Sequence, residues 1–104
     1  MHHHELNIPL PARLLHDLQE LARKYRKVGV ELFIFGSFAQ DKARPTSDLD
    51  LGVEWQGQPD PAIFRQLYQD VQTLPTIRPI DLVDFSQANS RFRQIAEAHK
   101  IDLL

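Results

Sequence analysis

The stretch GSFAQDKARPTSDLDLGVE, residues 36–54, combines a Gly-Ser pair, a polar loop and a strand that carries two aspartates. Residues 48–54 alternate between apolar and other side chains, as half-buried strands do. Three apolar residues share one face of this strand: Leu49, Leu51 and Val53. That face is predicted to meet the core, so Asp48 and Asp50 turn to the opposite face, about 6.6 Å apart along the strand.

A third carboxylate follows in PIDLVDF, residues 79–85, which reads as another strand. Ile80 and Leu82 are predicted to point to the core, which turns Asp81 to the opposite face. Asp84 lies three residues further on and is predicted to be a cap or a solvated residue. If the two acidic strands are neighbours, three carboxylates converge on one patch.

Three uncompensated carboxylates would repel one another and raise their pKa values, so such a cluster usually marks a divalent cation. Oxygen-only ligation suits Mg²⁺, with Mn²⁺ as the alternative. Two ions can share one carboxylate when a phosphate is transferred. The simpler alternative is that an Asp-x-Asp pair marks a solvated strand face or a turn.

The Gly-Ser pair supplies a second kind of signal. The run VELFIF, residues 30–35, is predicted to be a buried strand, and Gly36 at its end lets the backbone approach a ligand. Ser37 offers a hydroxyl and backbone N–H groups at the start of a short helix predicted over 37–43, where phosphate oxygens bind readily. An ordinary helix N-cap is the alternative reading of Ser37.

The rest of the chain surrounds these elements with helices. One helix is predicted from Pro11 to Gly29, a second begins with Asp60 as N-cap and Pro61 after it, and a last one begins near Ser86. The last helix is predicted to carry these residues on its inner face: Phe92, Ile95, Ala96 and His99. The order of elements predicts an α/β (α+β) fold in which a small mixed β-sheet packs against helices.

Length and composition agree with one small domain. The 104 residues are predicted to form a single domain over 1–104, with residues 1–10 as a poorly ordered N-terminal segment. His2–His4 are interpreted as tag residues or a chance cluster and take no part in the metal assignment.

Several classes of function are disfavoured. The formal charge of −2 argues against direct binding of nucleic acid, which usually needs a basic face. The chain has no cysteine, which excludes disulfides and thiolate metal sites and fits a reducing cytoplasm. No apolar run approaches the roughly 20 residues of a membrane span, and no signal peptide is evident. A cytoplasmic protein without a membrane partner is therefore expected.

Taken together, GSFAQDKARPTSDLDL resembles the signature of the DNA polymerase β-type nucleotidyltransferase superfamily, in which Gly-Ser, ten residues and Asp-x-Asp follow in order. Ala39, Ser47 and Leu51 extend the match to the minimal nucleotidyltransferases (MNT), and PIDLVDF fits the third acidic strand of the family. The resemblance covers nearly the whole chain from about residue 12. It implies the nucleotidyltransferase fold.

The resemblance also implies roles for individual residues. Asp48, Asp50 and Asp81 would be the catalytic and metal-binding carboxylates, with two Mg²⁺ ions, and Gly36 and Ser37 would bind the nucleotide. Many members have a basic residue and a glycine where this chain has Gln40 and Asp41. An acidic residue near a triphosphate is unfavourable unless it points away. Lys42 and Arg44 either face the same phosphates or are simply solvated.

Family members of this length are similar to the antitoxin of a toxin–antitoxin system whose partner is a helical HEPN protein. The resemblance implies an ATP-binding, Mg²⁺-dependent adenylyltransferase that transfers AMP to a tyrosine of that partner. After three strands and their helices few residues remain for a second domain, so a partner or a second copy would have to complete the site. The alternatives are an antitoxin that only occludes its HEPN partner and a nucleotidyltransferase acting on a small molecule such as an antibiotic. The acceptor, base preference and oligomeric state stay open.

Overall fold

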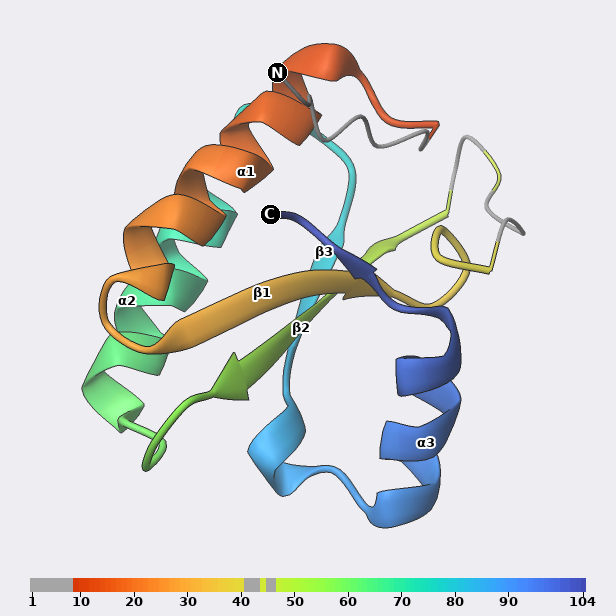
Figure 1. Cartoon of the computed structure of the whole chain (residues 1–104). Helices are drawn as coiled ribbons and strands as arrows, with labels where there is room; N and C mark the ends of the chain where they lie inside the picture. Colours follow the sequence, from red (N-terminus) through yellow and green to blue (C-terminus); the bar gives the residue numbers. More distant parts are fainter. Residues whose placement is uncertain (1–8, 41–43, 45–46) are drawn as a thin grey trace, which may run out of the picture.

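Helices cover both faces of a four-stranded mixed sheet in the computed structural model, which describes residues 9–40, 44 and 47–104 (Figure 1). The elements follow in this order: α1 (Ala12–Arg26), β1 (Val30–Phe35), β2 (Leu49–Trp55), α2 (Pro61–Gln72), β3 (Ile80–Asp84), the 3₁₀ turn η1 (Phe85–Gln87), α3 (Ser90–His99) and β4 (Ile101–Asp102). No helix within these described ranges is long and apolar enough to cross a membrane. The predicted α/β fold with a small mixed sheet is confirmed.

The strands lie in the order β3-β2-β1-β4, which places both acidic strands side by side. β1 pairs with β2 in antiparallel fashion, and Phe35 is the register partner of Asp50. β2 pairs with β3 in parallel, and Asp50 is the register partner of Asp81. The short strand β4, which pairs antiparallel with β1, was not predicted from the sequence. At two residues it is too short for a periodic pattern.

The two faces of the sheet carry separate apolar clusters. Figure 1 shows α1 and α2 together on one side and α3 on the other. The first cluster joins the predicted core residues of β2 to α1 and α2: Leu49, Leu51, Val53, Leu14, Leu18, Leu67 and Val71. The second joins β1 to η1 and α3: Phe33, Phe35, Phe85 and Ala96. In the second cluster the ring centroids of Phe33 and Phe85 lie 4.9 Å apart, in an edge-to-face arrangement.

The predicted start of α2 is confirmed and the short helix after β1 is only partly seen. The Asp60 side chain accepts hydrogen bonds from Ala62 N and Ile63 N, with Pro61 in the first turn. After β1 the Gln40 amide donates to the Gly36 carbonyl at 3.1 Å, which closes a single turn. The rest of the predicted helix, residues 41–43, lies outside the described residues, as does nearly all of the predicted N-terminal segment.

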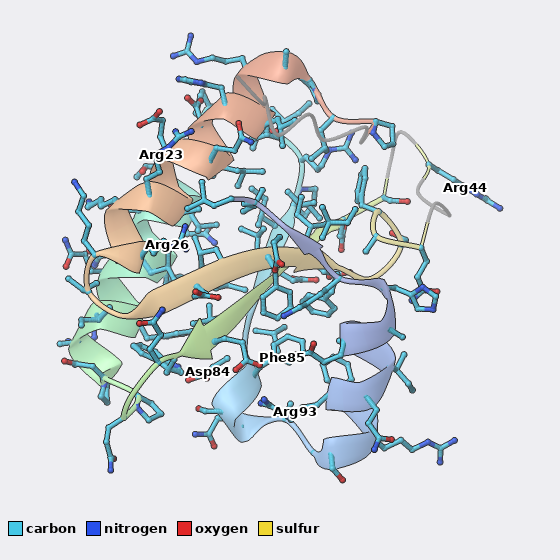
Figure 2. All side chains as sticks on the ribbon, viewed as in Figure 1. Arg23, Arg26, Arg44, Asp84, Phe85 and Arg93 are labelled. Carbon is cyan, nitrogen blue, oxygen red and sulfur yellow. The ribbon has the colours of Figure 1, made fainter. Side chains whose placement is uncertain are left out.

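The predicted inner face of the last helix is wrong in part. Ala96 is buried as predicted, and the Phe92 ring packs against Phe35 and Phe85 although it stays 39% exposed. Ile95 is 54% exposed and His99 is exposed, against the prediction. The one residue of α3 that is buried in the second cluster is Ala96, which packs with Phe33, Phe35 and Phe85. Arg93 then fixes the helix there, with an ion pair of 3.0 Å to Glu54 and a hydrogen bond from its guanidinium to the Phe85 carbonyl (Figure 2).

A substitution at Gly52 tests the packing of the second cluster. A Cβ at this position would lie 2.2 Å from Phe33 Cζ and 2.8 Å from Phe85 Cε1, whereas a Cβ at Gly57 would meet nothing within 4 Å. We expect Gly52→Ala to lower the free energy of unfolding by about 1–3 kcal/mol through overpacking. Gly57→Ala should leave it within about 0.5 kcal/mol. Urea denaturation measures both, and equal stability of the two variants would contradict this packing.

Candidate active site

Asp50 and Asp81 lie side by side where β2 and β3 pair. They are register partners in the parallel ladder, and neighbouring strands are about 4.8 Å apart. Both line an open cavity of about 630 Å³. The leucines on either side of Asp50 are fully buried in the first cluster, so the alternation of the strand sends the aspartates to the other face. The condition set from the sequence, that the two acidic strands are neighbours, is met.

Asp48 stands one step outside this pair. It is exposed, it directly precedes β2, and it does not line the cavity. It is nevertheless close enough to act on its neighbours: burial raises the pKa of Asp50, and the negative charges of Asp81 and Asp48 raise it further. The mutual repulsion of the three carboxylates expected from the sequence is thus present at Asp50.

Gly36 brings the backbone against the Asp50 carboxylate. Its φ is +74°, a conformation that favours glycine, and a Cβ here would lie 2.1 Å from Asp50 Oδ2. Gly36 and Gln40, the two ends of the turn after β1, both line the cavity. Ser37 is half-buried within that turn and is not part of the cavity lining. The geometry therefore joins Gly36 to the acidic pair and leaves Ser37 beside it.

The donor atoms of this site are of the kind that binds a hard cation such as Mg²⁺. They are carboxylate oxygens from adjacent strands, and Asp50 carries negative charge that its surroundings do not compensate. In the part of the chain that the structure describes, no three His, Asp or Glu side chains are grouped closely enough to hold one ion. Mg²⁺ usually takes one or two carboxylates and completes its shell with water and substrate phosphates. The pair Asp50 and Asp81 satisfies that requirement without a third carboxylate.

Large apolar side chains surround the mouth of the cavity. Tyr68 of α2 is 49% exposed and, with Phe92 and Ile95 of α3, lines the same cavity as the aspartates. The two α3 residues were predicted to face the core, and Tyr68 was not predicted to belong to the site. A signal for Tyr68 exists, because it follows Leu67 directly and so lies off the buried stripe of α2. Exposed apolar side chains that gather at one cavity, as these three do, indicate a contact surface.

Two further predictions can be placed. Asp84 is a cap, as predicted: its Oδ1 accepts from Ser86 N at 2.9 Å and from Trp55 Nε1 at 2.9 Å. Arg44 is exposed and points outward in Figure 2. Asp41 and Lys42, on which the expectation for the triphosphate also depends, lie outside the described residues.

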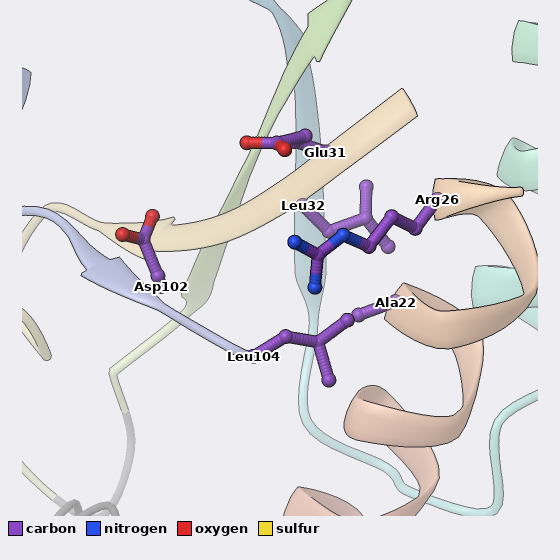
Figure 3. Close-up of a pocket in the computed structure, with 6 residues that line it drawn as sticks. All are labelled: Ala22, Arg26, Glu31, Leu32, Asp102 and Leu104. Atoms are coloured by element: carbon purple, nitrogen blue, oxygen red, sulfur yellow. The ribbon is translucent and has the colours of Figure 1, made fainter. Parts of the chain in front are cut away.

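A second cavity, of about 150 Å³, lies between α1 and the C-terminal strand. Figure 3 shows Arg26 extending from α1 into the space between Glu31, Asp102 and Leu104. This second cavity shares no lining residue with the cavity that Asp50 and Asp81 line. Of the site residues predicted from the sequence, Gly36, Asp50 and Asp81 line the first cavity, and none lines the second.

Comparison with known sequences gives a consistent result. Residues 16–103 match the model of a family described as polymerase beta, nucleotidyltransferase. A protein of Methanocaldococcus jannaschii, provisionally named a protein adenylyltransferase, is 31% identical over an alignment of 77 residues. The alignment covers 68% of this chain and 88% of that protein.

Solved structures share the fold. A chain in a crystal structure of a toxin–antitoxin with AMP-PNP aligns with a TM-score of 0.66 at 22% identity, over 86% of this chain and 72% of that chain. A chain in the structure of a tri-AMPylated Shewanella oneidensis HEPN toxin in complex with its MNT antitoxin aligns with a TM-score of 0.60 at 20% identity, over 88% and 69%.

Gly36 allows a test with a matched control. Gly36→Ala introduces a Cβ that collides with Asp50, whereas Gly29 has a similar φ of +81° but its nearest atom would be 3.9 Å away. Both variants carry the same backbone strain of about 1–2 kcal/mol. We expect only Gly36→Ala to weaken Mn²⁺ binding, by about tenfold or more, in titrations followed by electron paramagnetic resonance. Equal loss in both variants would show that strain, and not the position of Asp50, is responsible.

The raised pKa of Asp50 predicts a pH-dependent gain in stability from Asp50→Asn. The charged form is disfavoured in the folded state, so its cost is present at neutral pH and disappears as pH falls through the folded pKa toward the unfolded value of about 3.9. Without metal, the variant should melt at a higher temperature than the parent at pH 7, and the two melting temperatures should converge at about pH 4. Asp48→Asn is the comparison and should gain less stability, because it removes only the smallest of the three contributions to the raised pKa of Asp50. A less stable Asp50→Asn at neutral pH would contradict the assignment.

Proposed function

Because the chain belongs to the polymerase β-type nucleotidyltransferase family, we propose that it transfers AMP from ATP to a tyrosine of a HEPN-type partner protein in a Mg²⁺-dependent reaction. In this role it acts as the antitoxin of a toxin–antitoxin pair. The observation that carries the proposal is the cavity in which Asp50, Asp81 and Gly36 meet beneath exposed apolar side chains.

The relatives support the adenylyl transfer and the HEPN-type partner in this assignment. The archaeal relative is named for adenylyl transfer to protein, and one structural neighbour contains AMP-PNP. Another contains a HEPN toxin that carries AMP groups, together with its MNT antitoxin. These statements concern those proteins, and their convergence on one fold makes the same chemistry the first hypothesis for this chain.

The reaction joins an acceptor oxygen to the α-phosphorus of ATP. The tyrosine oxygen attacks in line, the bond from the α-phosphorus to the bridging oxygen of the β-phosphate breaks, and pyrophosphate leaves. Asp81 is exposed at the mouth of the site and orients the acceptor hydroxyl and takes its proton. The turn that begins at Gly36 and Ser37 lies beside the triphosphate, where its backbone can approach closely.

The carboxylates would also hold the metal, with Asp81 taking part beside its role toward the acceptor. Asp50 would be shared by two ions, because the charges of Asp81 and Asp48 both act on it. Asp48 would hold the ion on the nucleotide side. Bound Mg²⁺ supplies Lewis-acid polarisation of the phosphate and neutralises the charge of the triphosphate. The same ions would relieve the repulsion that raises the pKa of Asp50.

The apolar rim favours a protein as acceptor over a small polar molecule. Ile95 is 54% exposed, Tyr68 is 49% exposed and Phe92 is 39% exposed, and all three border the cavity that holds the aspartates. Exposed apolar side chains that gather round a polar site are typical of protein contact surfaces. A partner bound there would cover the cavity, exclude water from it and bring a tyrosine to Asp81.

Two variants separate catalysis from binding. In assays with labelled ATP, Mg²⁺ and a HEPN-type partner protein, Asp50→Asn should reduce label transfer by about 100-fold or more and leave complex formation intact. Ile95→Glu should weaken the complex by at least about tenfold, because it places a charge on the apolar rim. Ile77→Glu is the matched control, since Ile77 is fully exposed and lies outside the cavity lining.

The outcomes distinguish the alternatives. A tight complex without label in any sample identifies a binding module that neutralises its partner by occlusion. A parallel reaction contains an antibiotic such as an aminoglycoside in place of the protein. Label on this antibiotic but not on the protein identifies a small-molecule transferase. Transfer that survives Asp50→Asn at the parental rate would overturn the site assignment while leaving the family unaffected.

A further inference from the structure

Arg78 connects three chain segments that meet at the candidate active site. It lies between α2 and β3, three residues before Asp81. Its Nη1 donates a hydrogen bond to the Ser47 carbonyl at 2.6 Å. Its guanidinium lies over the Phe38 ring, 5.1 Å from the ring centroid. The side chain is half-buried, so both contacts form partly out of water.

Each contact adjoins a residue of the proposed site. Ser47 directly precedes Asp48, and a reciprocal pair of hydrogen bonds ties Ser47 to Arg44: Ser47 N to the Arg44 carbonyl at 2.9 Å and Arg44 N to Ser47 Oγ at 2.8 Å. Phe38 directly follows Ser37, is only 4% exposed and anchors the turn that starts at Gly36. Arg78 therefore holds both ends of the polar loop that separates the Gly-Ser pair from the aspartates.

The same segment also fixes the start of the acidic ladder. Leu49 N donates to the carbonyl of Pro79, the residue after Arg78, at 3.0 Å. This bond precedes the Asp50–Asp81 register pair by one step. Arg78 thus lies at the point where the turn after β1, the start of β2 and the start of β3 are joined.

We propose that Arg78 is a positioning residue that sets Ser37 and Asp48 relative to Asp50 and Asp81. A guanidinium suits this task, because its planar face stacks on a ring while its edge donates hydrogen bonds. A lysine ammonium lacks that plane and cannot make both contacts in the same geometry. The contacts stand by themselves, and only the effect on catalysis rests on the proposed function.

The first measurement needs no activity. Three backbone amides report on the junction through their hydrogen bonds: Gln40, Ser47 and Leu49. Arg78→Met keeps an apolar stem and removes the guanidinium, and we expect faster hydrogen exchange at these amides while amides of α1 stay protected. Arg91→Met is the control, because Arg91 is exposed on α3. Unchanged exchange at all three amides in Arg78→Met would overturn the proposal.

The second measurement is the transfer reaction. We expect Arg78→Met to lower kcat by about 10- to 100-fold with a smaller change in the KM of the partner protein, because the reacting groups lose alignment while the partner surface is untouched. Arg78→Lys should fold and recover only part of kcat, and it replaces Arg78→Met if that variant does not fold. Parental kcat in both variants, with faster exchange, would reduce Arg78 to a structural residue and overturn the proposal.

Failure of the proposed function can be told apart from failure of this inference. If the parent protein transfers no AMP, binding of Mg²⁺ and AMP-PNP by calorimetry replaces kcat as the readout. Weaker binding in Arg78→Met than in Arg91→Met then supports the positioning role. Equal binding, or no binding by any of the proteins, overturns it.

Discussion

The parallel pairing of β2 with β3 is the constraint on which the rest of the site depends. It makes Asp50 and Asp81 register partners and places two carboxylates on neighbouring strands. A shift of this register by one residue would turn one aspartate into the apolar cluster, at a large desolvation cost. The buried leucines around Asp50 oppose such a shift, so the packing of one face of the sheet fixes the chemistry of the other.

The site contains locally unfavourable interactions, whose cost the packing of the rest of the fold offsets. Burial and like charges raise the pKa of Asp50, and Gly36 adopts a positive φ so that the chain can pass beside that carboxylate. Such local costs are common where a protein binds an ion or a charged substrate, because the ligand relieves them. The second cluster packs beside the acidic pair on the same face of the sheet, and the first cluster fills the opposite face.

The open side of the cavity links the chemistry to a partner. Exposed apolar side chains of α2 and α3 border the acidic pair. Ala96 in the second cluster and the contacts of Arg93 to Glu54 and Phe85 hold α3 against the sheet. The proposed recognition of a protein acceptor therefore uses side chains of α3 that stay partly exposed while the helix is packed.

The sequence by itself determined the local features of this protein. Alternation in residues 48–54 separated the buried leucines from Asp48 and Asp50, and the spacing from Gly36 to Asp48 indicated the family to which the chain belongs. Short-range chemistry also predicted the Asp60 and Asp84 caps. The tertiary structure alone decided how Arg78 joins three distant segments, why Asp48 stands outside the cavity and which side of α3 stays exposed. These depend on contacts between residues far apart in the chain, whose distances no local pattern encodes.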